Sequence, residues 1–417
     1  MPAAVNPRGS GAAPGAGAGR LPGSMGKVTL SGKGRRWVVG GHPWVYADDL
    51  VAVEAQGGEL VPVHDPAGGV VGWGLYSSRS RIAMRLVSRT AEQPTREFWA
   101  ALVSAAVAER ARLGLLDPKG ACRLIGGDSE RLPGFVVDRY ADVLVVQSGC
   151  QGSDLMRDFL VGLVREALPF KVRAVLDRSD SSVRKLEGLE PRVEWIEGSV
   201  DDLVRVQEPD GLVYDVDLAQ GHKTGHYLDQ SANRRRAAQG AGGERVLDAF
   251  CYDGLFGIRA ALAGADDVLC IDQSATAGPR VLHNAELNGV SGKVRFERAN
   301  AMKHLRELAA GDTRWQRVVI DPPAFARNRK EIEGAARGYR ELNLRALELL
   351  TPGGLLVSAS CSYNVRREEF LGFLALAARD AGRDVYLEDL AGASPDHPVL
   401  LGLPESEYLK CAFLRAR

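Results

Sequence analysis

The pattern of hydrophobic and polar positions changes its period along the 417-residue chain. From 25 to about 90, short apolar runs separated by glycine favour evenly spaced short strands, and hence a small β-barrel. From Thr95 onward, the apolar positions of "TREFWAALVSAAVAERARLG" recur at helical spacing and end at Gly114. Strand-like and helical pieces then follow without a regular order. We therefore predict a mixed α+β block after the barrel.

A regular alternation begins at about residue 240. Strands that alternate with helices form a mostly parallel, doubly wound α/β sheet, whose ligands bind at the carboxyl ends of the strands. The predicted strands are 244–250, 267–272, 294–300, 315–323 and 353–361, and the helices between and after them are 254–264, 277–289, 301–311, 338–350 and 367–382.

Four segments follow from this pattern. We predict a disordered Gly/Ala/Pro-rich tail at 1–24, a β-barrel domain at 25–92, a middle α+β domain at 93–198 and a Rossmann-like α/β domain at 199–417. The informative side chains of the last domain should stand at its strand ends.

Composition narrows the class of protein. Lys and Arg total 53, as do Asp and Glu, so no global field indicates a nucleic-acid partner, although the first 47 residues carry six basic and no acidic residues. The six cysteines lack CxxC and zinc spacing, which argues against a metal site and a secreted disulfide framework. Without an apolar run of ~18–20 residues or a signal-peptide h-region, we expect a cytoplasmic protein with no membrane partner.

The first strands of the α/β domain end in side chains suited to a nucleoside. Asp248 is followed by a turn that ends in Gly254 and lacks the dinucleotide pattern GxGxxG. Asp272 can accept hydrogen bonds from two ribose hydroxyls, and Asn300 can pair with an adenine edge. A nucleoside cofactor without phosphates points to S-adenosylmethionine. The alternative is that acids and Asn simply favour turns.

The fourth strand ends in "VVIDPPAF". Two prolines make a rigid turn that aims the Asp321 carboxylate and the Pro322 carbonyl into the crevice, while Phe325 offers a face on which a base can stack. We assign base contacts to Pro322, Pro323 and Phe325. Further candidate cofactor contacts are the loop residues Phe250 and Tyr252 together with Asp321, which is also a candidate catalytic residue.

The fifth strand ends at Cys361, within "LVSASCSYNVR". A thiolate that adds to carbon 6 of a pyrimidine makes carbon 5 nucleophilic enough to take a methyl group. The start of the following helix could favour the thiolate. A single cysteine is more often a packing residue, and we read the remaining five in that way. For Cys361 we predict a nucleophile, with a buried thiol as the alternative.

Taken together, these residues resemble the bacterial large-subunit ribosomal RNA cytosine-5 methyltransferases. The resemblance runs from Met25 to the end of the chain. The segments that carry it are "GHPWVY" (41–46), "GHKTGHYLDQ" (221–230), "DPPAF" (321–325), "RGYRELN" (337–343), "SCS" (360–362), "DAGRDV" (380–385), "DHPV" (396–399) and "YLK" (408–410).

This resemblance implies an N-terminal PUA domain, a middle α+β domain and a class I methyltransferase domain. It also implies that Tyr227 and Gln230 line the cofactor and that Cys361 is the motif cysteine. The first loop departs from the family's usual "FSYTGGF", because it reads "FCYDGLF" and places Asp253 near the methionine end of the cofactor. This acid could bind the cofactor's ammonium or weaken cofactor binding.

Basic residues suit an RNA partner. Lys33, Arg35 and Arg36 in the barrel domain could contact phosphates, as could Arg327, Arg329 and Lys330 after the DPP turn, although each cluster could equally be a solvated surface. The nearby aromatic residues, among them Trp37, are predicted to be barrel core. His222 and His226 lack a third ligand, so we expect no metal. A homodimer is left open.

The sequence thus predicts a methyltransferase that uses S-adenosylmethionine to methylate carbon 5 of a cytosine, in ribosomal RNA, through a covalent Cys361 adduct. Two alternatives stay open. The DPPAF turn also resembles that of enzymes that methylate an exocyclic amine, which need no cysteine. Because Asp253 could weaken cofactor binding, the second alternative is an RNA-binding factor whose methyltransferase site has decayed.

Overall fold

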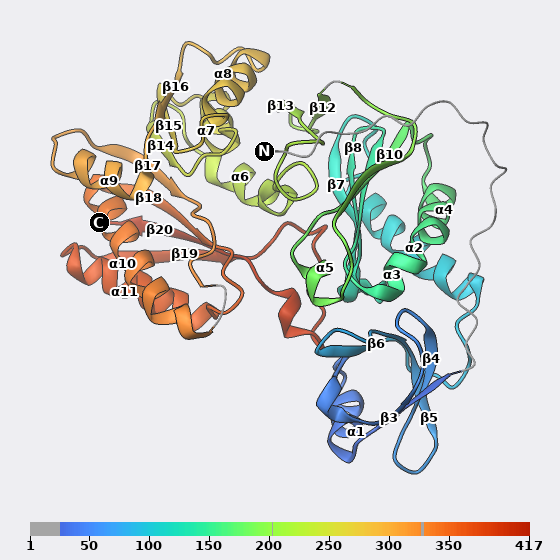
Figure 1. Ribbon diagram of the computed structural model, residues 1–417. Coiled ribbons are helices and arrows are strands. Elements are labelled where there is room, and N and C mark those ends of the chain that lie inside the picture. The colour runs from blue at the N-terminus through green and yellow to red at the C-terminus, as the bar shows by residue number, and fades with distance from the viewer. Residues whose placement is uncertain (1–25, 202, 327–328) are drawn as a thin grey trace. The chain divides into compact units, whose positions relative to one another are not determined.

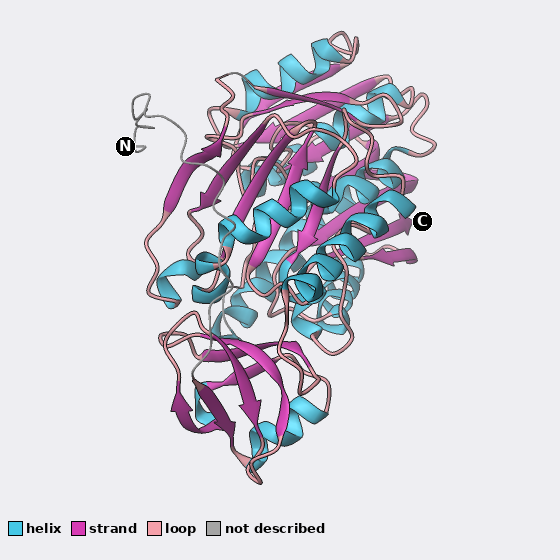
Figure 2. Ribbon diagram, turned by 90° about the vertical axis from the view of Figure 1, so that its right-hand side faces the viewer, coloured by secondary structure: helices cyan, strands magenta, loops and turns pink. Residues whose placement is uncertain are grey.

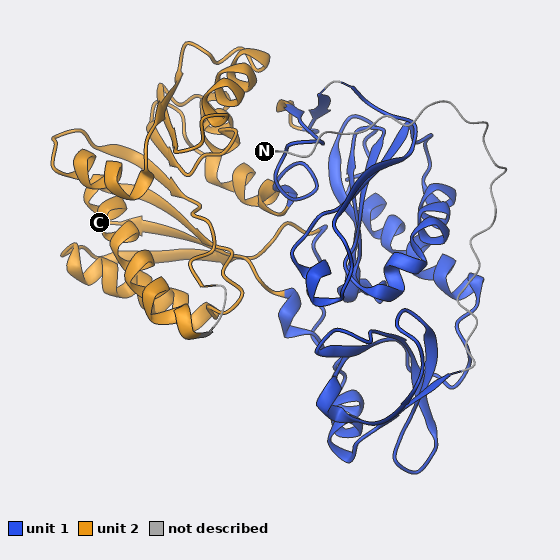
Figure 3. Ribbon diagram, viewed as in Figure 1, with its two compact units in different colours: residues 1–209, 215–228, 396–406 blue, residues 210–214, 229–395, 407–417 orange. Residues whose placement is uncertain are grey.

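A computed structural model describes residues 26–201, 203–326 and 329–417. The predicted tail and Arg327 lie outside these residues. The chain forms two compact units (Figure 3), each of which is described by itself. Unit 1 consists of 1–209, 215–228 and 396–406, and unit 2 of 210–214, 229–395 and 407–417. No helix in the described ranges is long and apolar enough to cross a membrane.

The first part of unit 1 is a six-stranded sheet in the order β2-β6-β5-β4-β1-β3. Figure 2 shows its strands curled into a barrel-like shape. Apolar side chains such as Val28, Val45, Val61 and Met84 alternate inward and form its core. Its elements are β1 (Lys27–Leu30), α1 (Gly32–Val39), β2 (Trp44–Tyr46), β3 (Leu50–Glu54), β4 (Leu60–His64), β5 (Val70–Tyr76) and β6 (Ile82–Ser88).

Helix α1 falls where the pattern suggested only short strands. Ser31 caps it by accepting a hydrogen bond from the Gly34 amide at 3.0 Å, a local signal that outweighs the low helix propensity of its two glycines. The helix carries Trp37, which was predicted to be core. That prediction is wrong, because 43% of Trp37 is exposed and its ring stacks on His42.

The second part of unit 1 is a five-stranded sheet in the order β11-β10-β9-β8-β7. Leu75 and Val87 of the first sheet pack in the same core as Trp99 and Phe135 of this part. Its elements are α2 (Arg96–Arg112), β7 (Ala121–Gly126), β8 (Phe135–Tyr140), β9 (Val143–Ser148), α3 (Gln151–Leu155), α4 (Arg157–Ala167), β10 (Ala174–Ser179), α5 (Val183–Leu186) and β11 (Arg192–Glu197). Strands β12 (Val204–Gln207) and β13 (Val213–Val216) pair separately.

Unit 2 is built on a seven-stranded sheet in the order β16-β15-β14-β17-β18-β20-β19. The first five of these strands are parallel, and β20 pairs antiparallel with β18 and β19. Its strands are β14 (Arg245–Ala249), β15 (Asp267–Asp272), β16 (Val294–Arg298), β17 (Trp315–Ile320), β18 (Leu350–Ser360), β19 (Val385–Ala391) and β20 (Lys410–Ala416).

Helices cover both faces of this sheet (Figure 1). Helices α9, α10 and α11 share a core with alternate strand residues such as Val318 and Leu356, whereas α6 and α7 pack on Val319 and Val357 of the other face. The predicted doubly wound arrangement is therefore present. The helices of unit 2 are α6 (Ser231–Ala238), α7 (Leu255–Leu262), α8 (Ala277–Leu287), α9 (Ala301–Ala309), α10 (Ile332–Leu349) and α11 (Arg367–Asp380).

The register of the central strands places their carboxyl ends at one level. Ala249 of β14 is opposite Ile320 of β17, which is in turn opposite Ser358 of β18. Asp321 and Cys361 follow directly after the last two strands. The loops after β14, β17 and β18 therefore meet at the same edge of the sheet, which we call the carboxyl edge.

Candidate functional site

The loop after β14 has an uncommon backbone. Phe250, Tyr252 and Gly254 have φ values of 63°, 55° and 80°, so two residues with side chains adopt the left-handed conformation that normally favours glycine. Such strain persists where the surroundings hold it, and it clusters at functional sites. A Cβ on Gly254 would lie 3.0 Å from the Val281 side chain, so glycine is needed there for space as well.

Asp248 lies beneath this loop. Its side chain is buried, and its Oδ2 accepts a hydrogen bond of 2.9 Å from the Gly257 amide in the first turn of α7. Its Oδ1 is buried without a hydrogen-bond partner among the described residues. The pKa of Asp248 is raised to about 8. Burial is the largest cause, and the neighbouring charges of Asp321, Asp253 and Asp272 contribute in the same direction.

Asp272 and Asn300 stand at the ends of the next two strands, as predicted. The Asp272 carboxylate accepts hydrogen bonds from the amides of Tyr252 (3.1 Å) and Ser274 (2.8 Å), so it ties the β14 loop to the end of β15. Asn300 is the N-cap of α9, where its Oδ1 accepts from the Lys303 amide at 3.1 Å. Capping accounts for an Asn at this position and still leaves its amide nitrogen for a ligand.

The DPPAF turn and the end of β18 lie against each other. The Cys361 Sγ is 4.0 Å from the Pro322 carbonyl oxygen. The Ser362 hydroxyl accepts a hydrogen bond of 3.0 Å from the Phe325 amide. All six cysteines are described, and Cys361 alone is partly exposed, whereas the others are buried. The packing role predicted for those five thiols agrees with their burial.

Within the turn, the two prolines and Phe325 differ in exposure. Pro322 is buried and Pro323 is exposed. The Phe325 ring is half-buried, with its centroid 4.9 Å from that of Tyr339 in a tilted arrangement. One side of Phe325 is therefore already packed, so only its remaining surface is left for a base.

Asp321 is held by a chain of amide side chains. Gln230 Nε2 donates to Asp321 Oδ2 at 3.0 Å, and Asn233 Nδ2 donates to Gln230 Oε1 at 2.7 Å and to the Gly392 carbonyl at 3.0 Å. Gln230 was predicted to line the cofactor. The structure gives it a definite contact with the DPP turn, which fixes the orientation of the Asp321 carboxylate.

Two residues of this edge escaped the sequence reasoning. Tyr339 shares its hydroxyl between Ser360 Oγ (2.7 Å) and Ser362 Oγ (3.0 Å), and burial raises its pKa to about 12. The Lys410 ammonium is buried and donates to the carbonyl of Ser362 at 2.8 Å. Both belong to segments of the family resemblance, "RGYRELN" and "YLK", which was the one signal available for them.

The remaining candidates belong to unit 1. Tyr227 is bonded to His222 through its hydroxyl (3.0 Å), and the Lys223 ammonium lies 4.4 Å from its ring centroid. Lys33 pairs with Asp49 at 2.8 Å and Arg35 with Asp65 at 3.3 Å, while Arg36 is exposed on α1. These basic side chains are at the surface of the small curled sheet.

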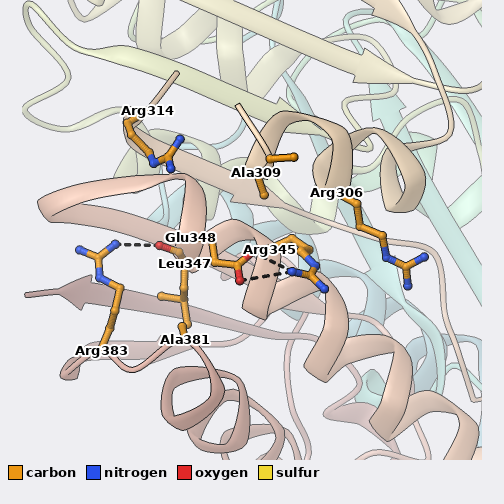
Figure 4. Close-up of a pocket in the computed structure, with 9 residues that line it drawn as sticks. Arg306, Ala309, Arg314, Arg345, Leu347, Glu348, Ala381 and Arg383 are labelled. Carbon is orange, nitrogen blue, oxygen red and sulfur yellow. Dashed lines mark hydrogen bonds and ion pairs between the residues drawn. The ribbon is translucent and has the colours of Figure 1, made fainter. Parts of the chain in front are cut away.

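A pocket of about 500 Å³ lies at the opposite, amino edge of the unit 2 sheet (Figure 4). The ends of α9, α10 and α11 meet there, and four arginines line it. Each already has a partner: Arg383 donates to the carbonyls of Leu347 and Leu350, Arg345 pairs with Glu348, Arg306 pairs with Glu341 and Arg314 donates to the carbonyls of Gly311 and Thr313. Two of these arginines satisfy carbonyls near helix ends and two form ion pairs, so we assign the pocket no part in the site.

In the described part of the chain, no group of three His, Cys, Asp or Glu side chains could hold a metal ion. The carboxyl edge instead gathers acids beneath a strained loop, a partly exposed thiol and a carboxylate oriented by Gln230. This arrangement can bind a cationic ligand and present a nucleophile beside it.

Comparison with known proteins gives a consistent result. Residues 28–89 match the family model of a PUA-like domain, and 184–401 match that of S-adenosylmethionine-dependent methyltransferases. Ribosomal RNA large subunit methyltransferase I of Tolumonas auensis is 38% identical over 380 residues, which cover 90% of this chain and 95% of the relative. The protein of the same name from Aeromonas hydrophila is 37% identical over 383 residues, with 90% and 96% covered.

Solved structures show the same fold. SMU.776, described as a methyltransferase and complexed with SAH, matches with a TM-score of 0.81 at 20% identity, covering 94% of this chain and all (100%) of that chain. A structure from Streptococcus mutans, described as SAM-dependent, matches with a TM-score of 0.79 at 19% identity and the same coverage, 94% and 100%. The predicted fold class is confirmed.

Proposed function

The chain belongs to the family of S-adenosylmethionine-dependent methyltransferases that includes ribosomal RNA large subunit methyltransferase I, and from this premise we propose that it methylates carbon 5 of a cytosine in ribosomal RNA. The observation that carries the proposal is the position of Cys361. It is the partly exposed cysteine of the described chain, and its Sγ faces the Pro322 carbonyl of the DPPAF turn at 4.0 Å. A methyltransferase that acts on an exocyclic amine has no use for such a thiol.

The residues present fit the cofactor. S-adenosylmethionine carries a sulfonium and an ammonium, and supplies an electrophilic methyl group when bound. The carboxyl edge gathers the carboxyl groups of Asp248, Asp253, Asp272 and Asp321, and the buried Asp248 Oδ1 has no hydrogen-bond partner among the described residues. A positive ligand nearby would favour the ionised form of Asp248 and offset its burial.

We assign the cofactor contacts by position. Phe250, Tyr252 and Gly254 form the loop that would lie along the cofactor, Asp272 would accept hydrogen bonds from the ribose, and Asn300 would offer its amide to the adenine. Asp253 is buried near Asp248 and adds a further carboxyl group, which favours binding of the cofactor's ammonium over a decayed site. Tyr227 is retained as a candidate contact from the resemblance alone.

Cys361 is the nucleophile of the proposed reaction. Its thiolate adds to carbon 6 of the cytosine, so a sulfur–carbon bond forms and the electrons of the ring double bond move to carbon 5. Carbon 5 would then take the methyl group, whose bond to the sulfonium sulfur breaks, so that S-adenosylhomocysteine leaves. Loss of the carbon 5 proton to a base restores the double bond and expels the Cys361 thiolate.

Asp321 orients the base. Gln230 holds one carboxylate oxygen, so the carboxylate is fixed in a position to accept a hydrogen bond from the exocyclic amine of cytosine. Pro322, Pro323 and the remaining surface of Phe325 complete the base contacts. Lys33, Arg35 and Arg36 on the PUA-like sheet would contact RNA phosphates, which positions RNA without reading its sequence.

RNA in which cytosine is replaced by 5-fluorocytosine tests the mechanism. Fluorine cannot leave carbon 5 as a cation, so the Cys361 adduct should persist after methyl transfer as a covalent complex seen on a denaturing gel. We expect this complex with ribosomal RNA and not with a Cys361→Ala variant. Nucleoside analysis of RNA methylated by the enzyme should give 5-methylcytosine.

Other outcomes would identify the alternatives. An N-methylated base without an adduct would replace the proposal by exocyclic methylation at the DPPAF turn. No binding of S-adenosylmethionine in a calorimetric titration would indicate a decayed site.

A further inference from the structure

Lys410 is placed beside the proposed nucleophile by strand pairing. It is the first residue of β20 and is directly opposite Ser360, the residue that precedes Cys361. Only 2% of Lys410 is exposed, although its side chain ends in an ammonium. Burial of such a charge is costly unless an anion or several acceptors surround it.

The hydrogen bonds of Lys410 aim it at the end of β18. Its Nζ donates to the carbonyl of Ser362 at 2.8 Å and to that of Tyr408 at 2.9 Å. An ammonium has three donors, so these two carbonyls leave one proton for a further acceptor. Because Ser362 follows Cys361 directly, the ammonium is anchored next to the thiol.

Charged groups near Lys410 already have partners of their own. Glu407 pairs with Arg367 at 2.9 Å, and both are partly exposed. Glu369 accepts a hydrogen bond of 2.7 Å from the Arg366 amide at the start of α11. Among the described residues whose charge acts on Lys410, the Cys361 thiolate is the strongest anionic neighbour.

Electrostatic effects agree with this geometry. Burial lowers the pKa of Lys410 to about 8. The negative charges of Cys361, Glu407 and Glu369 raise this pKa, and Cys361 has the largest effect of the three. The positive charge of Arg367 lowers it. The ammonium therefore carries its charge at neutral pH and loses it as the pH rises through about 8.

Among the described residues, Tyr339 and Asp321 also lie near the thiol. Tyr339 is uncharged at neutral pH because its pKa is raised to about 12, and it serves to fix Ser360 and Ser362. Asp321 is a negative neighbour that disfavours a thiolate. A positive charge at this edge would therefore favour ionisation of the thiol at neutral pH.

We propose that Lys410 is a positioning residue that holds Cys361 in its thiolate form. Through its hydrogen bond to the Ser362 carbonyl it also fixes the backbone that presents the sulfur. The consequence for methyl transfer rests on the proposed function, whereas the effect on the thiol does not.

Alkylation of Cys361 by iodoacetamide tests the proposal without RNA or cofactor. The rate would be followed against pH by mass spectrometry of the Cys361 peptide, which separates it from the five buried thiols. In the unaltered protein we expect half-maximal reactivity below pH ~8.5, the ordinary thiol value. Half-maximal reactivity at or above that pH would overturn the proposal, and this measurement needs no variant.

Variants separate charge from hydrogen bonding. Lys410→Gln keeps a donor for the carbonyls but removes the charge, so its alkylation midpoint should rise by about 1 pH unit or more, with a roughly tenfold slower reaction at pH 7. Lys410→Arg keeps the charge and should restore much of the low-pH reactivity. Lys303→Gln, at an exposed lysine paired with Glu307, is the matched control and should change nothing.

An unchanged midpoint in a folded Lys410→Gln protein would refute the inference. The 5-fluorocytosine adduct is read separately. Loss of the adduct with a preserved shift in alkylation would reject the cytosine mechanism and leave the Lys410–Cys361 relation intact.

Discussion

The two edges of the unit 2 sheet have opposite electrostatic character. Two aspartates illustrate the difference. Asp267 begins β15 at the amino edge, and Asp248 lies near the end of β14 at the carboxyl edge. Arg295 and Arg245 hold Asp267 at 3.0 and 3.3 Å and lower its pKa. Burial among other acids raises the pKa of Asp248 to about 8.

The direction of the helices explains part of this contrast. In a doubly wound fold the helices run opposite to the strands, so their C-termini gather at the amino edge, where cations are favoured. Arg383 and Arg314 satisfy helix-end carbonyls there. Helix N-termini gather at the carboxyl edge, where the Gly257 amide in the first turn of α7 donates to Asp248 of β14.

The contrast teaches where function can be found in such a sheet. The amino edge holds a pocket of about 500 Å³, and its arginines are bonded to helix-end carbonyls or paired with glutamates. The carboxyl edge gathers the carboxyl groups of Asp248, Asp272 and Asp321 and a partly exposed thiol. The side chains that gather at an edge, and not the presence of a pocket, therefore identify the candidate site.

The strongest test of this comparison is the loss of one side chain from each edge. Cys361→Ala should lower methyl transfer to RNA by roughly three orders of magnitude or more, because it removes the proposed nucleophile. Arg306→Gln removes an exposed amino-edge ion pair and should stay within about twofold of the unaltered rate. Initial rates with a labelled methyl donor would measure both. A comparable loss in the two variants would break the comparison.

The β14 loop gives the next largest effect. Gly254→Ala puts a side chain at φ 80° and 3.0 Å from Val281, which should cost about 1–2 kcal/mol of stability and weaken cofactor binding. Gly292→Ala, before β16, is the control, since no atom lies within 4 Å of its added Cβ. Thermal unfolding and calorimetry with S-adenosylmethionine would measure both properties. Equal effects in the two variants would show that the loop is not strained.

Asp248 and Asp267 should respond to pH in opposite ways. Between pH about 4 and about 8 the folded protein keeps a proton on Asp248 that the unfolded chain releases, so this residue lowers stability as the pH rises, by at most about 1.4 kcal/mol per pH unit. Asp248→Asn should remove that slope. Asp267→Asn should leave the slope and lower stability above pH ~4, because the lowered pKa of Asp267 stabilises the folded state there.

Hydrogen exchange of peptides from β14 and β15, measured at pH 5 and pH 8 with correction for the intrinsic rate, would report these changes locally. A slope that persists in Asp248→Asn would place the proton elsewhere.

The sequence was sufficient for much of the carboxyl edge. Alternating periods located the strands, and because parallel strands end at one edge, Asp248, Asp321 and Cys361 could be grouped without coordinates. Cys361 stood out from the other thiols because it ends the fifth strand, level with the DPP turn, and its partial exposure agrees with that interpretation. The roles of these side chains remain proposals.

What escaped prediction depends on contacts distant in the sequence. Lys410 lies at the end of β18 because β20 pairs antiparallel with β18. The local sequence pattern does not determine the register of this pairing. Gln230 and Asp321 are 91 residues apart in the sequence, so the hydrogen bond by which Gln230 orients the Asp321 carboxylate could not be predicted. Helix α1 was missed because a capping serine, and not helical periodicity, decides its start.

The smallest effect expected concerns the amino edge itself. Arg345 pairs with Glu348 at 2.9 Å and Glu341 at 2.9 Å, and 29% of its side chain is exposed. Arg345→Gln should therefore destabilise the protein by less than about 1 kcal/mol, and by less still at high salt, since partly exposed pairs are screened. Urea denaturation at low and high salt would measure this. Methyl transfer per folded molecule should not change, because Arg345 is paired with glutamates at the amino edge and does not contact the carboxyl edge. A salt-independent loss above that size, or a loss of activity, would mean that the two edges are coupled through α10.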